Sequence, residues 1–240
     1  IISNCVYDDE AAYNNKTNGN VSTAYGVLVD GKAICEGYAR AFQLLCNKLG
    51  IECVSIAGMT GDVGHEWNCA KIDGNWYQVD VTWNDSQDDF SNYYYFNLTD
   101  EQMYSSHRAD DLFDEIEPDN YNNDENLIGN LYVPECNSTE YNYYNQTAPI
   151  LYAFDEENDN TISNALANSA VNGDNYFNII VGDSLDFEDA YSTLVQDGYV
   201  VNYIESANNM LWGEVELDTS SYAYKNDTLR VITIVLNYIN

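Results

Sequence analysis

The segment His65–Trp83, which reads HEWNCAKIDGNWYQVDVTW, decides the fold of this chain. It contains two runs rich in aromatic and β-branched residues, His65–Ile72 and Asn75–Trp83, which are typical of β-strands. The dipeptide Asp73-Gly74 joins them, and this dipeptide between two such runs is the strongest short-range signal for a two-residue hairpin. We therefore predict an antiparallel hairpin, to which Tyr93–Leu98 adds a third strand.

The two-residue turn also predicts the register of the hairpin. His65 then lies opposite Thr82, and Trp67 lies opposite Asp80. His65 and Asp80 become diagonal neighbours on one face of the sheet, about 7–8 Å apart at the backbone and within side-chain reach. In that arrangement a carboxylate fixes the tautomer of an imidazole and stabilises its protonated form.

An amphipathic helix is predicted before the hairpin, over Ala33–Leu49, because apolar residues recur there at three- and four-residue steps. Gly50 is the expected stop. The strand Glu52–Met59 and a loop over Gly58–Gly64 are expected to follow. The apolar residues at helical spacing are Tyr38, Ala41, Phe42, Leu45 and Leu49.

Cys35 falls in the first turn of this helix, where backbone N–H groups and the helix dipole favour a thiolate over a thiol. This location makes Cys35 a candidate nucleophile. The chain has only 2 histidines, and His65 is a better base than His107 because it is predicted to pair with Asp80. Three other cysteines, which lack a helix start, are interpreted as small buried hydrophobic residues: Cys46, Cys53 and Cys69.

Three motif blocks around these residues resemble bacterial transglutaminase-like domains: Gly31–Ala39 (GKAICEGYA), Gly64–Asn68 (GHEWN) and Trp76–Trp83 (WYQVDVTW). The likeness runs from about Val21 to Arg108. It implies an α+β, papain-like core in which a helix carrying a cysteine packs on an antiparallel sheet carrying a histidine and an aspartate. One departure is Glu66, where a small residue is expected after the histidine.

The resemblance implies roles for single residues. Cys35 is expected to be the nucleophile, His65 the base and then the acid, and Asp80 the orienting carboxylate. The backbone N–H of Cys35 is the expected first donor of an oxyanion hole. Tyr25 is the expected second donor, with an ordinary core role as the alternative. Three tryptophans are expected to wall the site or fill the core: Trp67, Trp76 and Trp83.

The implied reaction is thiolate attack on a peptide or carboxamide, followed by transfer of the acyl group to water or to an amine. The same residues serve a cysteine protease, an amidase and a transglutaminase, so this choice stays open, and no metal or cofactor is required. The rival interpretation is a non-catalytic extracellular module that keeps the fold and binds protein or glycan through its aromatic surfaces.

The charge of the chain limits the classes of partner that it is expected to bind. It has 40 acidic against 8 basic residues and a net charge of -32, which disfavours nucleic acid and anionic lipid. We expect a protein or peptide substrate, a secreted or cell-surface location, and no membrane span, because no apolar run approaches about 20 residues. The 6 cysteines form neither a dense disulfide scaffold nor a C-x-x-C zinc pair, and the oligomeric state stays open.

Two domains are expected. Residues 1–138 form the transglutaminase-like domain, which we interpret as N-terminally trimmed because the chain begins abruptly at Ile1. Residues 146–240 form a small α/β or α+β domain without catalytic motifs. Its predicted strands are Ile150–Phe154, Tyr176–Val181, Tyr199–Glu205 and Thr228–Tyr238, and its predicted helices are Thr161–Val171 and Phe187–Gln196.

Overall fold

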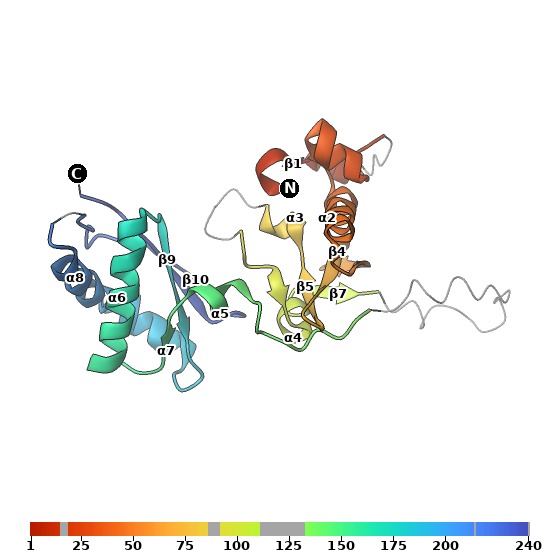
Figure 1. The fold of residues 1–240 in the computed structure, drawn as a ribbon. Coiled ribbons are helices and arrows are strands. Elements are labelled where there is room, and N and C mark those ends of the chain that lie inside the picture. The colour runs from red at the N-terminus through yellow and green to blue at the C-terminus, as the bar shows by residue number, and fades with distance from the viewer. Residues whose placement is uncertain (15–18, 86–91, 111–132, 214, 240) are drawn as a thin grey trace. The chain divides into compact units, whose positions relative to one another are not determined.

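The computed structural model describes residues 1–14, 19–85, 92–110, 133–213 and 215–239 (Figure 1). These residues divide into two compact units, Ile1–Asn142 and Tyr143–Asn240. Each unit combines helices with one larger sheet. None of the helices in the described ranges has the length and hydrophobicity that a bilayer-spanning segment needs.

The first unit is built on a five-stranded antiparallel sheet in the order β6-β5-β4-β3-β7. This α+β arrangement, with a long helix against an antiparallel sheet, confirms the expected fold class. The strands are β3 (Cys53–Thr60), β4 (Val63–Ile72), β5 (Asn75–Val79), β6 (Phe96–Leu98) and β7 (His107–Ala109). The smaller elements are the 3₁₀ turn Ile2–Asn4, β1 (Val6–Tyr7), α1 (Asp9–Tyr13), the π-helical turn Gly26–Asp30, β2 (Lys32–Ala33), α3 (Val81–Asn84) and α4 (Asp100–Met103).

The central hairpin has the predicted turn and register. Asp73 and Gly74 both adopt positive φ, 48° and 89°, as a two-residue turn of this kind requires. The pairing runs from Ile72 opposite Asn75 to Asn68 opposite Val79. The β4–β5 hairpin is therefore confirmed in its turn and in its alignment.

The second strand of the hairpin is shorter than predicted. It ends at Val79, because Asp80 leaves the ladder and caps α3, accepting hydrogen bonds from the backbone N–H groups of Thr82 (2.8 Å) and Trp83 (3.1 Å). The expected pairs of His65 with Thr82 and of Trp67 with Asp80 therefore do not form in the ladder. A capping carboxylate offers the first helical N–H groups a partner that a strand cannot provide.

The prediction of a loop over Gly58–Gly64 was also wrong, because β3 and β4 extend through this segment to a tight turn at Gly61. The predicted third strand, Tyr93–Leu98, is shortened to β6. A further strand, β7, adds to the free edge of β3 and was not predicted. A strand of three residues that pairs with a distant strand cannot be predicted from its own short sequence pattern.

Helix α2 (Cys35–Leu49) begins two residues later than predicted, because Ala33 pairs with Tyr7 in the small parallel sheet of β1 and β2. Cys35 thereby becomes the first helical residue. Gly50 ends the helix with φ 77°, and its N–H caps the carbonyls of the last turn. The helix packs on β3 and β4, where the Asn68 side chain donates to the carbonyl of Ala39 (3.1 Å).

The second unit has a mixed four-stranded sheet in the order β10-β11-β9-β8, in which β8 and β9 are parallel and the other two pairs are antiparallel. Its helices are α5 (Tyr143–Thr147), α6 (Glu156–Asn172), α7 (Phe187–Tyr191), the π-helical turn Ser192–Gln196 and α8 (Val200–Leu211). Its strands are β8 (Ile150–Leu151), β9 (Tyr176–Val181), β10 (Ala223–Asn226) and β11 (Val231–Val235).

One element of this unit contradicts its prediction. Tyr199–Glu205 was expected to be a strand, but it lies in α8, which packs against α6. The buried residues of α8 recur at helical spacing: Val200, Tyr203, Ile204, Ala207 and Leu211. The periodicity over twelve residues outweighs the β-branched start of the segment.

Gly58 provides a test of the packing that joins β3, β4 and β7. A methyl group there would lie 2.2 Å from the carbonyl oxygen of Arg108 and 2.6 Å from Cη2 of Trp67. Gly58→Ala should therefore lower the free energy of unfolding by about 1–3 kcal/mol, measured by urea denaturation. The matched control is Gly64→Ala in β4, where an added methyl group would have no atom of the described residues within 4 Å apart from its chain neighbours, and the free energy should change by less than about 0.5 kcal/mol. Equal effects of both substitutions would contradict this packing.

Candidate active site

Asp80 is the centre of the site, and its side chain is completely buried. Oδ1 accepts the two backbone hydrogen bonds of the α3 cap, while Oδ2 accepts from Nε2 of His65 (2.6 Å) and Nε2 of His107 (2.9 Å). Burial opposes ionisation most strongly, but the hydrogen bonds and charge of the two imidazoles outweigh it, so the pKa of Asp80 lies below its ordinary value. Both carboxylate oxygens therefore have hydrogen-bond partners.

His65 lies on β4, and its side chain is only 6% exposed. An ionised carboxylate can only accept hydrogen bonds, so Nε2 of His65 must carry the hydrogen that it donates to Asp80. In the neutral ring this leaves the lone pair on Nδ1. The ring stacks on Trp67, with centroids 6.0 Å apart and an interplanar angle of 20°, which restricts its orientation. His65 and Asp80 thus meet as predicted, although through a cap and not through a continuous strand pair.

Cys35 lies at the start of α2 and is 7% exposed. Its thiol donates to Oε2 of Glu36, 3.4 Å away, and in the described residues no hydrogen bond joins this sulfur to His65. Burial, followed by the negative charge of Glu36, raises the pKa of Cys35 to about 12, although the backbone N–H of Glu66 favours the thiolate. The sulfur therefore faces the backbone of the residue that follows His65.

The direction of this pKa contradicts the sequence expectation for Cys35. The helix start was expected to favour the thiolate, but burial and the neighbouring carboxylate raise the pKa. Burial in a low-dielectric environment penalises the charged form of a thiol, and a nearby negative charge adds to that penalty. In the resting arrangement the thiol is therefore neutral.

His107 is the residue that the sequence interpretation missed. It lies on β7, is 3% exposed, and binds the same oxygen of Asp80 as His65 does. Its other nitrogen, Nδ1, lies 2.8 Å from Oγ of Ser106. The only sequence signal was that the chain has just 2 histidines, since the β3–β7 pairing that brings His107 here cannot be read locally.

The predicted aromatic residues take different places. Trp67 is completely buried, and its Nε1 donates to Oε1 of Gln78 (2.7 Å). Trp83 is 36% exposed and lies 6.0 Å from the His65 ring and 4.6 Å from the His107 ring, measured between centroids. Trp67 therefore supports the site from the core, whereas Trp83 forms its partly exposed wall.

Three other residues singled out in the sequence have different surroundings. Trp76 lies under the ammonium group of Lys71, 5.5 Å from its ring centroid. Glu66 accepts from Ser55 and forms an ion pair with Arg40 at 3.8 Å. Tyr25 is 53% exposed, so core packing does not explain it, and its role as an oxyanion donor stays a prediction.

The potential ligand atoms of His65, Asp80 and His107 lie within 4.8 Å of one another, so these three residues form a group that could hold a metal ion. However, both Nε2 atoms use their protons to bind the shared carboxylate oxygen. A cation between them would have to displace both protons. We therefore assign these residues to a hydrogen-bonded group.

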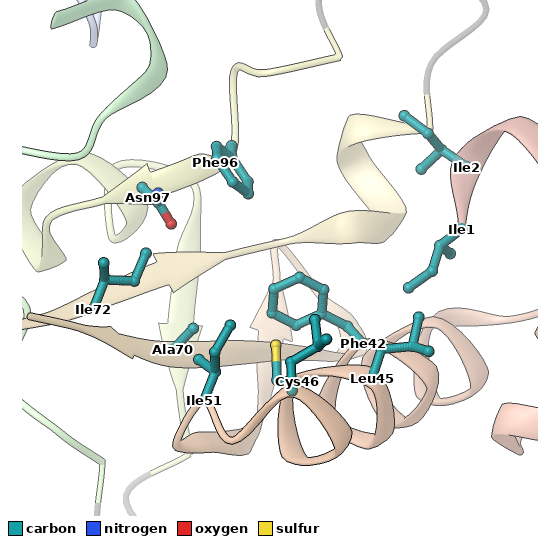
Figure 2. Close-up of a pocket in the computed structure, with 11 residues that line it drawn as sticks. Ile1, Ile2, Phe42, Leu45, Cys46, Ile51, Ala70, Ile72, Phe96 and Asn97 are labelled. Carbon is teal, nitrogen blue, oxygen red and sulfur yellow. The ribbon is translucent and has the colours of Figure 1, made fainter. Parts of the chain in front are cut away.

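The first unit also contains an apolar cavity of about 410 Å³ lined by the C-terminal half of α2, by residues of β4 and β6, and by Ile1 and Ile2 (Figure 2). Phe42, Leu45, Ile51 and Phe96 are among the residues that line it. Its lining does not include Cys35, His65 or Asp80, so this cavity is separate from the candidate active site.

Comparisons with known proteins find one family and two mammalian relatives with partial similarity to this chain. Residues 1–81 match the transglutaminase-like superfamily. The mouse kyphoscoliosis peptidase (Mus musculus) is 30% identical over 128 residues, covering 48% of this chain and 19% of the mouse protein. The human kyphoscoliosis peptidase (Homo sapiens) is 29% identical over 108 residues, covering 40% of this chain and 16% of the human protein.

The chain thus spans less than a fifth of either relative. A crystal structure described as a TGase overlaps 36% of this chain and 25% of its own, with 23% identity and a TM-score of 0.32. Both relatives named above are mammalian, so the bacterial character expected from the motifs stays a prediction. The superfamily match, together with the observed α+β core, shows that this chain contains a transglutaminase-like domain.

Proposed function

We propose that the first unit catalyses thiol-dependent acyl transfer on peptide or carboxamide substrates, with Cys35 as nucleophile, His65 as base and Asp80 as orienting carboxylate. The observation that carries this proposal is the 2.6 Å bond from Nε2 of His65 to buried Asp80, which leaves Nδ1 as the basic nitrogen. Cysteine-based acyl transfer is also common in the superfamily to which the domain belongs.

The reaction begins with transfer of the Cys35 thiol proton to Nδ1 of His65. The sulfur then attacks the substrate carbonyl carbon, and the resulting oxyanion accepts from the backbone N–H of Cys35, which as the first residue of α2 has no partner within its helix. Tyr25 is the predicted second donor. Asp80 stabilises the imidazolium that His65 has become.

The imidazolium next gives its proton to the leaving amine as the C–N bond breaks, and a thioester remains on Cys35. Water or an acceptor amine then attacks the thioester while His65 takes a proton from it. The proton returns to sulfur when the acyl group leaves. Hydrolysis yields a protease or amidase, and amine attack yields a transglutaminase.

Activation must overcome the resting bond between the thiol and Glu36. Sγ has to leave Oε2 of Glu36 before its proton passes to His65, so a substrate that moves or neutralises Glu36 favours the reactive arrangement. The same bond favours the alternative function, a non-catalytic protein- or glycan-binding module, because a thiol with a pKa of about 12 is a poor nucleophile.

Mass spectrometry after incubation with a peptide library and a primary amine separates these functions. Peptide cleavage would indicate a hydrolase, and incorporation of the amine into glutamine-containing peptides would indicate a transglutaminase. Both products should disappear with Cys35→Ala. Identical product patterns from the native chain and this variant would favour the binding module.

Asp80→Asn tests the role of the carboxylate. The asparagine side chain retains an acceptor oxygen for the α3 cap, but it lacks the charge that stabilises the imidazolium. We expect kcat to fall about 10²–10⁴-fold, measured with whichever substrate the peptide screen identifies. Circular dichroism should show a folded protein, and a folded variant with native kcat would remove Asp80 from the mechanism.

Glu36→Gln tests the second cause of the high thiol pKa, the negative charge that adds to the effect of burial. Removing the carboxylate removes a negative charge beside Sγ, so the pKa of Cys35 should fall and its alkylation should become faster at neutral pH. The measurement is the pH dependence of iodoacetamide labelling at Cys35, followed by peptide mapping. Glu101→Gln, on the exposed surface of α4, is the matched control and should leave the profile unchanged. A profile for Glu36→Gln that coincides with this control would contradict the assigned cause.

A further inference from the structure

His107 completes a hydrogen-bonded row that extends beyond the three proposed catalytic residues. Ser106 Oγ lies 2.8 Å from Nδ1 of His107. His107 Nε2 then reaches Oδ2 of Asp80 at 2.9 Å, opposite the 2.6 Å bond from His65. The row therefore runs Ser106, His107, Asp80, His65.

The donors and acceptors of this row determine its protons. Asp80 is ionised and accepts only, so His107 must donate from Nε2. In neutral His107, Nδ1 then accepts from the Ser106 hydroxyl at 2.8 Å, a shorter contact than the 3.4 Å from the same hydroxyl to the carbonyl oxygen of Met103. Among the described residues, Nδ1 of His65 is then the one ring nitrogen of the row without a hydrogen bond.

The contact between His107 and Asp80 also links distant parts of the sheet. Asp80 follows β5 and His107 begins β7, and two strands, β4 and β3, separate β5 from β7. The bond therefore crosses the sheet and connects the α3 cap to its far edge. Trp83 and Trp67 enclose the His107 ring, with centroid distances of 4.6 Å and 5.1 Å.

We infer that His107 is a positioning residue that holds the Asp80 carboxylate, and through it the His65 ring, in the geometry needed for acyl transfer. This inference rests on the proposed function. A carboxylate held on Oδ1 by the cap and on Oδ2 by two imidazoles cannot turn when His65 takes up or releases a proton. Without His107, one of the two donors to Oδ2 is lost and the His65 bond alone must hold that oxygen.

The test compares His107→Phe, which keeps an aromatic ring but no donor, with His107→Gln, whose amide keeps a donor. Because the chain has 2 histidines, either variant leaves His65 as the only histidine, so its ¹⁵N spectrum is unambiguous. We expect His65 to be the Nε2–H tautomer in the native chain, a tautomer mixture in His107→Phe, and mainly Nε2–H in His107→Gln.

The kinetic readout is acylation of Cys35 by p-nitrophenyl acetate. Its maximal rate should fall about 10–100-fold in His107→Phe with KM unchanged, and His107→Gln should recover part of it. Ser106→Ala, which retains His107, should give a smaller tautomer shift and replaces His107→Phe as the test variant if His107→Phe does not fold.

An unchanged His65 spectrum in the folded variants, or equal spectra for His107→Phe and His107→Gln, would overturn the inference. Absence of acylation in the native chain together with the expected spectra would reject the proposed function alone.

Discussion

The arrangement of the first unit depends on one buried carboxylate that accepts four hydrogen bonds. Asp80 has no exposed surface, and an isolated charge there would be too costly to bury. Two backbone N–H groups and two imidazoles compensate that cost, and they come from α3, β4 and β7. The same charge therefore ends β5, starts α3 and orients His65.

Much of this arrangement could be predicted from local sequence. The Asp73-Gly74 turn sets the register of β4 and β5, and that register brings His65 near Asp80. The end of β5 could not be read from the pattern, because Val-Thr-Trp after Asp80 suits a strand as well as a capped turn. In the second unit, α8 was mistaken for a strand because its first residues are β-branched and aromatic.

The rest of the site depends on tertiary context. His107 reaches Asp80 only because β7 pairs with β3, a contact between segments about fifty residues apart along the chain. The helix start was predicted to within two residues, but burial and Glu36 reverse its expected effect on the Cys35 thiol. A helix dipole contributes at most about 2 kcal/mol, and desolvation of a buried thiolate exceeds that contribution. The resting state to explain is thus a neutral thiol that, among the described residues, is hydrogen-bonded to Glu36 and not to His65.

The most direct test of this account is detection of a thioester on Cys35. The native chain is exposed to p-nitrophenyl acetate, and intact-protein and peptide mass spectrometry then locate the acetyl group. The account predicts a single acetyl group on Cys35 that a primary amine or water removes, and no such adduct with His65→Gln. Equal acetylation of the native chain and this variant, or acetylation confined to other residues, would contradict the account.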